Sequence, residues 1–306
     1  MGKEPSRVVV VQATYDDVCH NIAKAMSFIG PLALTSSKSV VIKINLCDAR
    51  TPETGTITHP LFLDGVLCYL RENFEDLKIY VVESDATVAL ADEFIKWLGF
   101  VPILKKWDAQ FINLANTTVV KRKMDGRYFR EVPVPEILEQ SDFFITMPKP
   151  KTNLISTITC CLKNQFGCLP TVQKEIYHPH LDDVIADVNS AIRPDLCLVD
   201  GIIAMGGPHG PSNGVPIPLK AIICSKDPVA VDAYCAGIMG FHPRFIGHIR
   251  KSASSGVGCM KYALCGDKID KVDFEINKLE MWLLKLASSL QRRGRQQFRA
   301  EGLKAR

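Results

Sequence analysis

Residues 39–83 read SVVIKINLCDARTPETGTITHPLFLDGVLCYLRENFEDLKIYVVE, and this stretch decides the fold. Its two ends, 39–44 and 78–83, are short runs rich in β-branched residues, a pattern typical of buried strands. Between them, Pro60 opens a segment whose apolar residues recur at helical spacing. A strand, a helix and a second strand in this order are the repeating unit of a parallel sheet.

The same alternation continues on both sides of this unit. Further strands are predicted at residues 7–11, 101–104, 143–147, 196–199 and 220–224, and further helices at 18–29, 90–98, 181–192 and 228–239. Repeated strand–helix units bury both faces of a sheet under helices. We therefore predict an α/β protein with a mostly parallel, doubly wound sheet and helices on both faces.

Residues 109–132 interrupt this alternation. Two extended runs flank the sequence Met124-Asp125-Gly126-Arg127, and Asp-Gly between such runs indicates a β-hairpin. We predict a hairpin insertion at 109–132 within an α/β core at 1–268. Residues 269–306 are expected to form an amphipathic C-terminal helix and a basic tail, since Leu279, Trp282, Leu283, Leu286 and Leu290 recur at helical spacing.

The net charge of +4 is concentrated in that tail. Residues 285–306 contain seven lysines and arginines but a single acidic residue, so the rest of the chain is slightly acidic. This distribution argues against a basic nucleic-acid-binding body. Contact with nucleic acid or a membrane surface is expected only through the tail.

Eleven cysteines are distributed in apolar or strand-like contexts rather than in a spaced framework. We therefore expect reduced thiols. The N-terminus lacks the apolar stretch of a signal peptide, and no run of about 18 uncharged apolar residues occurs. These features predict a cytoplasmic protein.

Polar residues follow several of the predicted strands, at the edge where parallel α/β sheets bind ligands. The richest segment runs from Lys149 to Lys174. Its ammonium, hydroxyl and amide groups can donate hydrogen bonds to a phosphate or carboxylate. The residues predicted to bind an anionic small molecule are Lys43, Asn45, Lys149, Lys151, Thr152, Lys163, Asn164 and Lys174.

Solvated surface lysines are the simpler alternative for each position taken alone. Lys43 argues against it, because a lysine inside the apolar run 40–44 needs an outlet or a partner. Asp200, at a strand end, and His178 are the predicted acid/base residues. His178-Pro179-His180 is only weakly metal-like, since a third ligand must come from elsewhere, and the pattern assigns no metal ligands.

Several of these segments occur together in one known family. They are Lys43-Ile44-Asn45-Leu46, Thr58-His59-Pro60, Lys149-Pro150-Lys151-Thr152, Leu162-Lys163-Asn164-Gln165-Phe166-Gly167, Lys174 with His178, Val199-Asp200-Gly201-Ile202 with Met205, Gly206-Gly207 and Asp227-Pro228-Val229-Ala230-Val231-Asp232. In this order, over roughly residues 7–245, the chain resembles the family catalogued as domain of unknown function 362. The resemblance implies a shared site without a settled activity, and some members of that family append ferredoxin-like cysteine runs.

The chain departs from the family pattern in two respects. It has no Cys-x-x-Cys-x-x-Cys run, so the cysteine spacing disfavours an iron–sulfur cluster. Asn153 stands where the family often has a histidine after the paired lysines. Cys160, Cys161 and Cys168 match no common zinc or cluster signature and are interpreted as buried structural thiols.

Three hypotheses follow from the sequence. The first is a small-molecule enzyme or cofactor-handling protein that binds an anionic ligand through clustered lysines. The second is an iron–sulfur or other metal-binding redox protein. The third is a non-enzymatic binding protein that uses its basic C-terminal helix.

Overall fold

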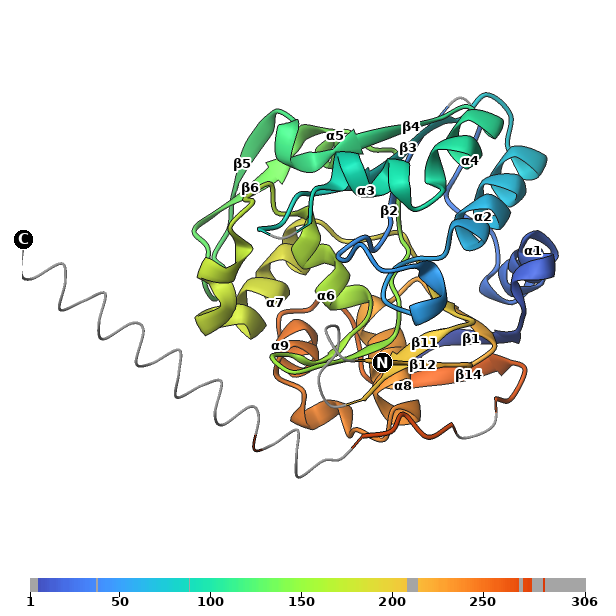
Figure 1. Cartoon of the computed structure of the whole chain (residues 1–306). Coiled ribbons are helices and arrows are strands. Elements are labelled where there is room, and N and C mark those ends of the chain that lie inside the picture. Colours follow the sequence, from blue (N-terminus) through green and yellow to red (C-terminus); the bar gives the residue numbers. More distant parts are fainter. Residues whose placement is uncertain are drawn as a thin grey trace, which may run out of the picture.

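The computed structural model describes residues 5–36, 38–87, 89–207, 214–269 and 272–276, together with Leu283. An eight-stranded sheet forms its centre (Figure 1). The strand order is β14 (Tyr262–Gly266), β1 (Ser6–Gln12), β13 (Ala221–Ser225), β10 (Leu196–Gly201), β7 (Phe143–Thr146), β2 (Ser39–Lys43), β3 (Lys78–Glu83) and β4 (Ala109–Asn113). All run in one direction except β13, which pairs antiparallel with β1 and β10. The predicted mostly parallel sheet is confirmed.

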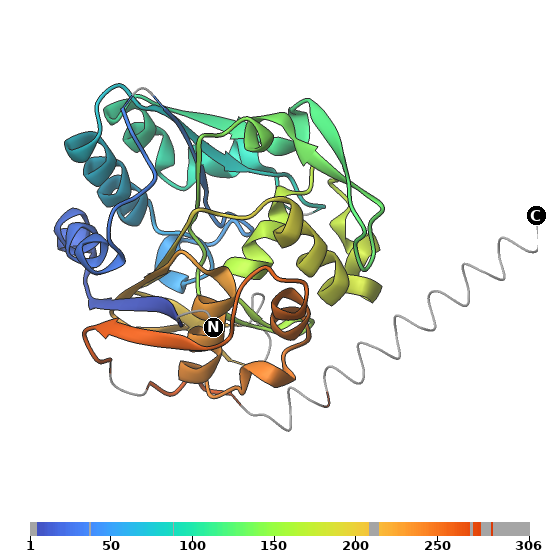
Figure 2. The ribbon, with the colours of Figure 1, turned by 180° about the vertical axis from the view of Figure 1, so that it is seen from behind.

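Helices cover both faces of this sheet, which confirms the doubly wound prediction (Figures 1 and 2). One face packs against α1 (Val18–Ile29), α2 (Pro60–Asn73), α3 (Ala91–Trp97) and α4 (Phe100–Lys106), and the other against α6 (Cys161–Gln165), α7 (Leu181–Ala191), α8 (Pro228–Ile238) and α9 (Gly247–Ser254). Val8 and Val10 join one apolar cluster, whereas Val9 and Val11 join the other. Burial on both faces explains why the strands are continuous apolar runs.

Short one-turn elements complete the described chain. The 3-10 helices are η1 (Tyr15–Asp17), η2 (Pro52–Thr54), η3 (Leu114–Asn116), η4 (Phe166–Cys168), η5 (Lys174–His180) and η6 (Pro243–Phe245), and α5 (Glu136–Glu139) is a short α-helix.

Two predicted elements are corrected. Residues 101–104 lie inside α4 rather than in a strand, because Phe100 and Leu104, four residues apart, are both buried on one helical face. The hairpin consists of β5 (Val119–Lys123) and β6 (Glu131–Pro135), while residues 109–113 form β4 at the edge of the main sheet. Its turn is longer than an Asp-Gly turn because the carboxylate of Asp187 accepts the backbone N–H groups of residues 127–129.

A second sheet was not predicted. It contains four strands in the order β12 (Val215–Ile217), β11 (Ala204–Gly206), β8 (Lys151–Asn153) and β9 (Thr157–Thr159). Each strand is three residues long, too short for an alternating pattern to show in the sequence. The strand β8 carries Lys151 and Thr152, so this sheet holds part of the lysine-rich segment in a defined geometry.

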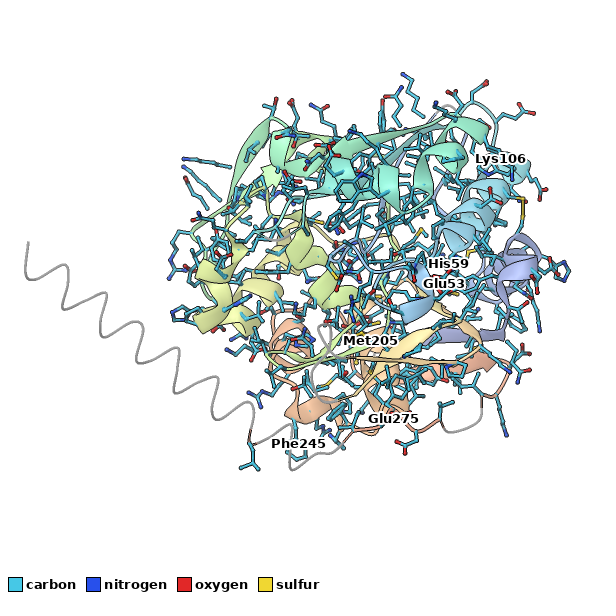
Figure 3. All side chains as sticks on the ribbon, viewed as in Figure 1. Glu53, His59, Lys106, Met205, Phe245 and Glu275 are labelled. Atoms are coloured by element: carbon cyan, nitrogen blue, oxygen red, sulfur yellow. A yellow bond between two sulfur atoms is a disulfide. The ribbon has the colours of Figure 1, made fainter. Side chains whose placement is uncertain are left out.

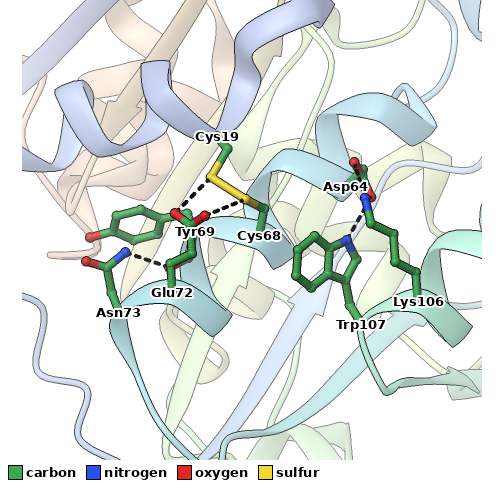
Figure 4. The surroundings of a disulfide bond; sticks show 8 residues. All are labelled: Cys19, Asp64, Cys68, Tyr69, Glu72, Asn73, Lys106 and Trp107. Carbon is green, nitrogen blue, oxygen red and sulfur yellow. Dashed lines mark hydrogen bonds and ion pairs between the residues drawn. A yellow bond between two sulfur atoms is a disulfide. The ribbon is translucent and has the colours of Figure 1, made fainter.

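The expectation of reduced thiols is wrong for one pair. Cys19 of α1 and Cys68 of α2 form a disulfide, and both sulfurs lie 3.4–3.5 Å from the carboxylate of Glu72 (Figure 4). The sequence pattern missed this pair because the two helices meet only in the tertiary structure. The other nine cysteines are free.

Most of the predicted C-terminal amphipathic helix and basic tail at 269–306 lies outside the described residues, which include only residue 269, residues 272–276 and Leu283 of this range. Residues 272–276 form neither helix nor strand. None of the described helices combines the length and the apolar character needed to cross a lipid bilayer.

Candidate functional site

A cavity of about 560 Å³ lies where the carboxyl ends of β2 and β3 meet the second sheet. We call it the lysine cavity. Its wall includes most of the predicted site residues, namely Lys43, Asn45, Lys151, Thr152, Lys163, Asn164, Lys174 and His178. A hollow of about 640 Å³ elsewhere, beside Gln12 and Asn21, contains none of them. Residues predicted from their positions after strand ends therefore line one common cavity.

Lys43 forms the floor of the cavity together with Glu83. Its Nζ lies 2.6 Å from Glu83 Oε1, and both side chains are almost fully buried. Lys43 Nζ also donates to the carbonyl of Ile44, and Glu83 accepts the backbone N–H groups of Leu46 and Ser84. The sequence expectation that Lys43 needs a partner is confirmed. A Cβ at Gly167 would lie 2.9 Å from Lys43 Nζ and 3.2 Å from Glu83 Oε1, so a side chain there would press on this ion pair.

A chain of side-chain hydrogen bonds orients Lys151. Lys151 Nζ donates to Asn45 Oδ1 at 2.6 Å, and Asn45 Nδ2 donates to Asn164 Oδ1 at 3.1 Å. Asn164 Nδ2 in turn donates to Thr146 Oγ1. Lys151 also donates to the carbonyl of Thr56 at 2.7 Å and contacts Cys47 Sγ. All of these acceptors are neutral, so the positive charge of Lys151 is not cancelled by them.

The last two lysines of the cavity differ in their bonding. Lys174 Nζ donates to Ser84 Oγ at 2.9 Å and to the carbonyl of Asp85 at 2.6 Å. Lys163 Nζ makes neither a hydrogen bond nor an ion pair with any residue that the structure describes, and it lies 5.8 Å from the ring centre of Phe166. Burial lowers the pKa of both amines to about 8, with nearby lysines adding to the shift.

Lys149 and Asp200 are not brought into this cavity. Lys149 Nζ lies 3.0 Å from Asp200 Oδ2, and neither side chain is exposed. Asp200 also accepts the hydroxyl of Tyr15 at 3.0 Å and the backbone N–H of His59 at 2.9 Å. Burial lowers the pKa of the Lys149 amine, whereas the charge of Asp200 opposes that shift. A direct catalytic role for Asp200 stays a prediction.

Tyr15 and His59 close this buried network. Their rings stack with centres 3.9 Å apart. His59 lies next to Glu53, with Nε2 and Oε1 separated by 3.8 Å (Figure 3). Burial lowers the pKa of His59 and, together with Asp200, raises that of Tyr15. The network joins the start of α2 to β10 and the segment before β8.

The paired histidines do not converge. His178 lines the lysine cavity with its ring 6.5 Å from Phe166, whereas His180 is exposed and lies against Tyr128. Neither belongs to a described group of side chains that could jointly hold a metal ion. Asp227 and His59 cap helices through their side chains, as their positions before Pro228 and Pro60 predict.

A cluster of thiols lies behind the cavity, at the start of α6. Sγ of Cys160, Sγ of Cys161 and a carboxylate oxygen of Asp232 lie within 4.8 Å of one another, and all three residues are buried. Asp232 accepts the backbone N–H groups of Cys161 and Leu162 at 2.8 and 3.1 Å. Cys168 lies apart, with its sulfur 3.2 Å from Gln165 Oε1. We call the three residues Cys160, Cys161 and Asp232 the thiol cluster.

Sequence reasoning missed Glu83 and Tyr15 as site residues. Glu83 had a signal, because it ends a strand at the same edge as Lys43. Tyr15 had none, since it meets Asp200 across 185 positions of sequence.

The chain is similar to several known proteins in sequence or in structure. A thylakoid-associated protein of Synechocystis is 26% identical over 214 residues, which are 68% of this chain and 64% of that protein. The chain thus spans somewhat less than two thirds of this relative's length. The lactate racemase apoprotein of Thermoanaerobacterium thermosaccharolyticum shares 10% identity over 76% of this chain and 57% of its own, with a TM-score of 0.44. A protein of Thermotoga maritima shares 14% sequence identity over 76% of this chain and 60% of its own, with a TM-score of 0.40.

A family model also matches this chain, over a range that includes the site. The model described as Domain of unknown function (DUF362) matches residues 40–237. This range includes all of the predicted site residues, from Lys43 to Asp200. The chain therefore belongs to the DUF362 family.

Proposed function

We propose that the protein is a cytoplasmic small-molecule enzyme or cofactor-handling protein that binds an anionic ligand, a phosphate or a carboxylate, in the lysine cavity. The charge of the lysine cavity supports this proposal. Four lysines line the described wall, against the two glutamates Glu83 and Glu175. Among these lysines Lys43 is ion-paired with Glu83, and the lining as a whole contains two more lysines than glutamates, which leaves an excess of positive charge. Buried cations without counter-ions are costly unless a partner is supplied.

The roles within this proposal follow from position. Lys163 and Lys174 would donate to the ligand's oxygens, whereas Lys151 already has three acceptors and would contribute its charge. The hydroxyl of Thr152 is already committed to the carbonyl of Gly207. His178 would serve as the acid/base group, because it lines the cavity and an imidazole can both accept and donate a proton. Lys149 and Asp200 would support the wall without touching the ligand.

Replacing Lys163 with methionine is expected to weaken the binding of inorganic phosphate by roughly ten- to hundredfold, the value of one hydrogen bond to a charged group. Isothermal titration calorimetry at pH 7 measures this effect. Lys163 is the suitable position because its amine holds no described residue in place, so the fold should tolerate the change.

Lys96→Met is the matched control, since Lys96 is a surface lysine paired only with Glu93. If the wild type, Lys163→Met and Lys96→Met proteins bind phosphate with equal affinity, the proposal that the lysine cavity binds anions is wrong. Acetate in place of phosphate tests the carboxylate alternative in the same way.

A second candidate function is metal binding, which the thiol cluster favours. Two thiols and a carboxylate are suitable zinc ligands. Burial raises the pKa of Cys161 and of Asp232, and the nearby Cys160 raises both further. A bound cation would compensate the deprotonated groups, whereas an iron–sulfur cluster would need four cysteine ligands.

Protein purified without oxygen or chelator is expected to contain zinc in a near-stoichiometric amount under this candidate. Elemental analysis should show that Asp232→Asn and Cys160→Ser lose the metal, while Cys259→Ser, which alters an exposed thiol, retains it. Wild-type protein free of both zinc and iron would contradict metal binding at the thiol cluster.

A further inference from the structure

Lys163 differs from the three other lysines of the cavity in one respect. Lys43 is fixed by Glu83, Lys151 by three acceptors, and Lys174 by Ser84 and Asp85. The amine of Lys163 is the one among these four that no described residue binds. It is also partly exposed to the cavity, so a ligand can reach it.

Its surroundings suit a nucleophile better than a structural cation. The ring of Phe166 and the side chains of Val172 and Met205 provide an apolar part of the wall, while Lys151 supplies a nearby positive charge. Amines are activated as nucleophiles when they are desolvated or placed beside another cation. Both conditions apply to Lys163, and its pKa of about 8 means that part of the population is unprotonated at neutral pH.

We propose that Lys163 forms an imine with the carbonyl carbon of an anionic aldehyde or ketone, such as a 2-oxo acid, bound in the lysine cavity. The inference rests on the proposed function and names its substrate class. The amine nitrogen bonds to the carbonyl carbon, the carbon–oxygen bond breaks, and the oxygen leaves as water. Ammonium plus carbonyl thus yields an iminium ion plus water, with no oxidant or reductant involved.

The remaining lysines fit this chemistry. Lys151 and Lys174 line the cavity with cationic side chains that attract the carboxylate or phosphate of the substrate. Ser84 and Asp85 engage two of the three N–H groups of Lys174, which leaves one for an oxygen of the ligand. The Lys43–Glu83 pair fixes the floor beneath. An iminium on Lys163 withdraws electrons from the carbon next to it, which is how amine catalysts labilise bonds in 2-oxo acids.

Borohydride trapping tests the proposal directly. Wild-type protein is incubated with pyruvate, reduced with sodium borohydride, and analysed by intact mass and peptide mapping. A reduced adduct on Lys163 is the expected result. Its yield should increase from pH 7 to pH 9, because the unprotonated amine attacks. Burial and the charge of Lys151 lower the pKa of Lys163, and Cys47 opposes that shift. Burial lowers the pKa of His248, and the charge of Lys163 lowers it further.

Lys163→Arg separates this inference from the proposed function. Arginine retains the cation, so phosphate binding should persist, but it forms no imine, so the adduct should disappear. If the wild type binds phosphate and yet gives no adduct on Lys163 with either pyruvate or glyceraldehyde 3-phosphate, the imine is overturned and anion binding is left standing. An adduct on Lys163 in a protein that binds no phosphate or acetate would leave the imine standing and overturn anion binding.

Discussion

Lys149→Met is expected to lower the free energy of unfolding by about 3–5 kcal/mol, the typical cost of removing one partner of a buried ion pair. Asp200 would then hold an uncompensated charge at a position with no solvent exposure. Tyr15 and His59 would still donate to it, but both donors are neutral. Urea unfolding followed by circular dichroism measures the change, and an unchanged m-value would show that the denatured state is unaffected.

Two further variants identify the cause. In the double variant Lys149→Met with Asp200→Asn, the buried charge is gone and the amide oxygen can still accept from His59, so part of the lost stability should return. A surface control, Lys96→Met, should cost less than about 1 kcal/mol, because its pair with Glu93 is solvated. If Lys149→Met unfolds at the same urea concentration as this control, the buried pair contributes nothing to the fold.

Glu83→Gln is expected to combine a loss of stability with a gain in anion binding. The change leaves the ammonium of Lys43 buried without its counter-ion, again at a cost of about 3–5 kcal/mol. It also places an amide N–H₂ against either Lys43 Nζ or the backbone N–H of Leu46, where no acceptor is available. Both effects destabilise the folded state.

Phosphate affinity should change in the opposite direction. Removing the negative charge of Glu83 increases the net positive charge of the cavity, and a unit charge at about 10 Å in a medium of effective dielectric constant about 20 is worth roughly tenfold in affinity. Calorimetry and urea unfolding on the same sample separate the two effects. Glu93→Gln, on the surface, should alter neither. A Glu83→Gln protein that binds phosphate more weakly than the wild type would contradict the charge-excess explanation of the cavity.

The sequence pattern predicted most of the sheet because the relevant signals are local. Strand β3 occupies 78–83 as expected, and α1 ends before Gly30 as expected. The region between residues 100 and 135 was harder, because the apolar run of α4 is short enough to fit either a strand or a helix. The four three-residue strands of the second sheet left no pattern because they are too short to show an alternation. The pairing of β8 with β11, which joins the two halves of that sheet, links segments about 50 residues apart.

The candidate site divides in the same way. The sequence by itself determined which residues follow the strands, and in a parallel sheet those positions share an edge, so Lys43, Asn45 and the lysine-rich segment were identified together. Only the tertiary structure decided which amine is neutralised, which is hydrogen-bonded and which is free of described partners. Charges and hydrogen bonds act over a few ångströms, and the partners of Lys43 and Lys149 come from other strands, so their pairing depends on how the strands are arranged in space.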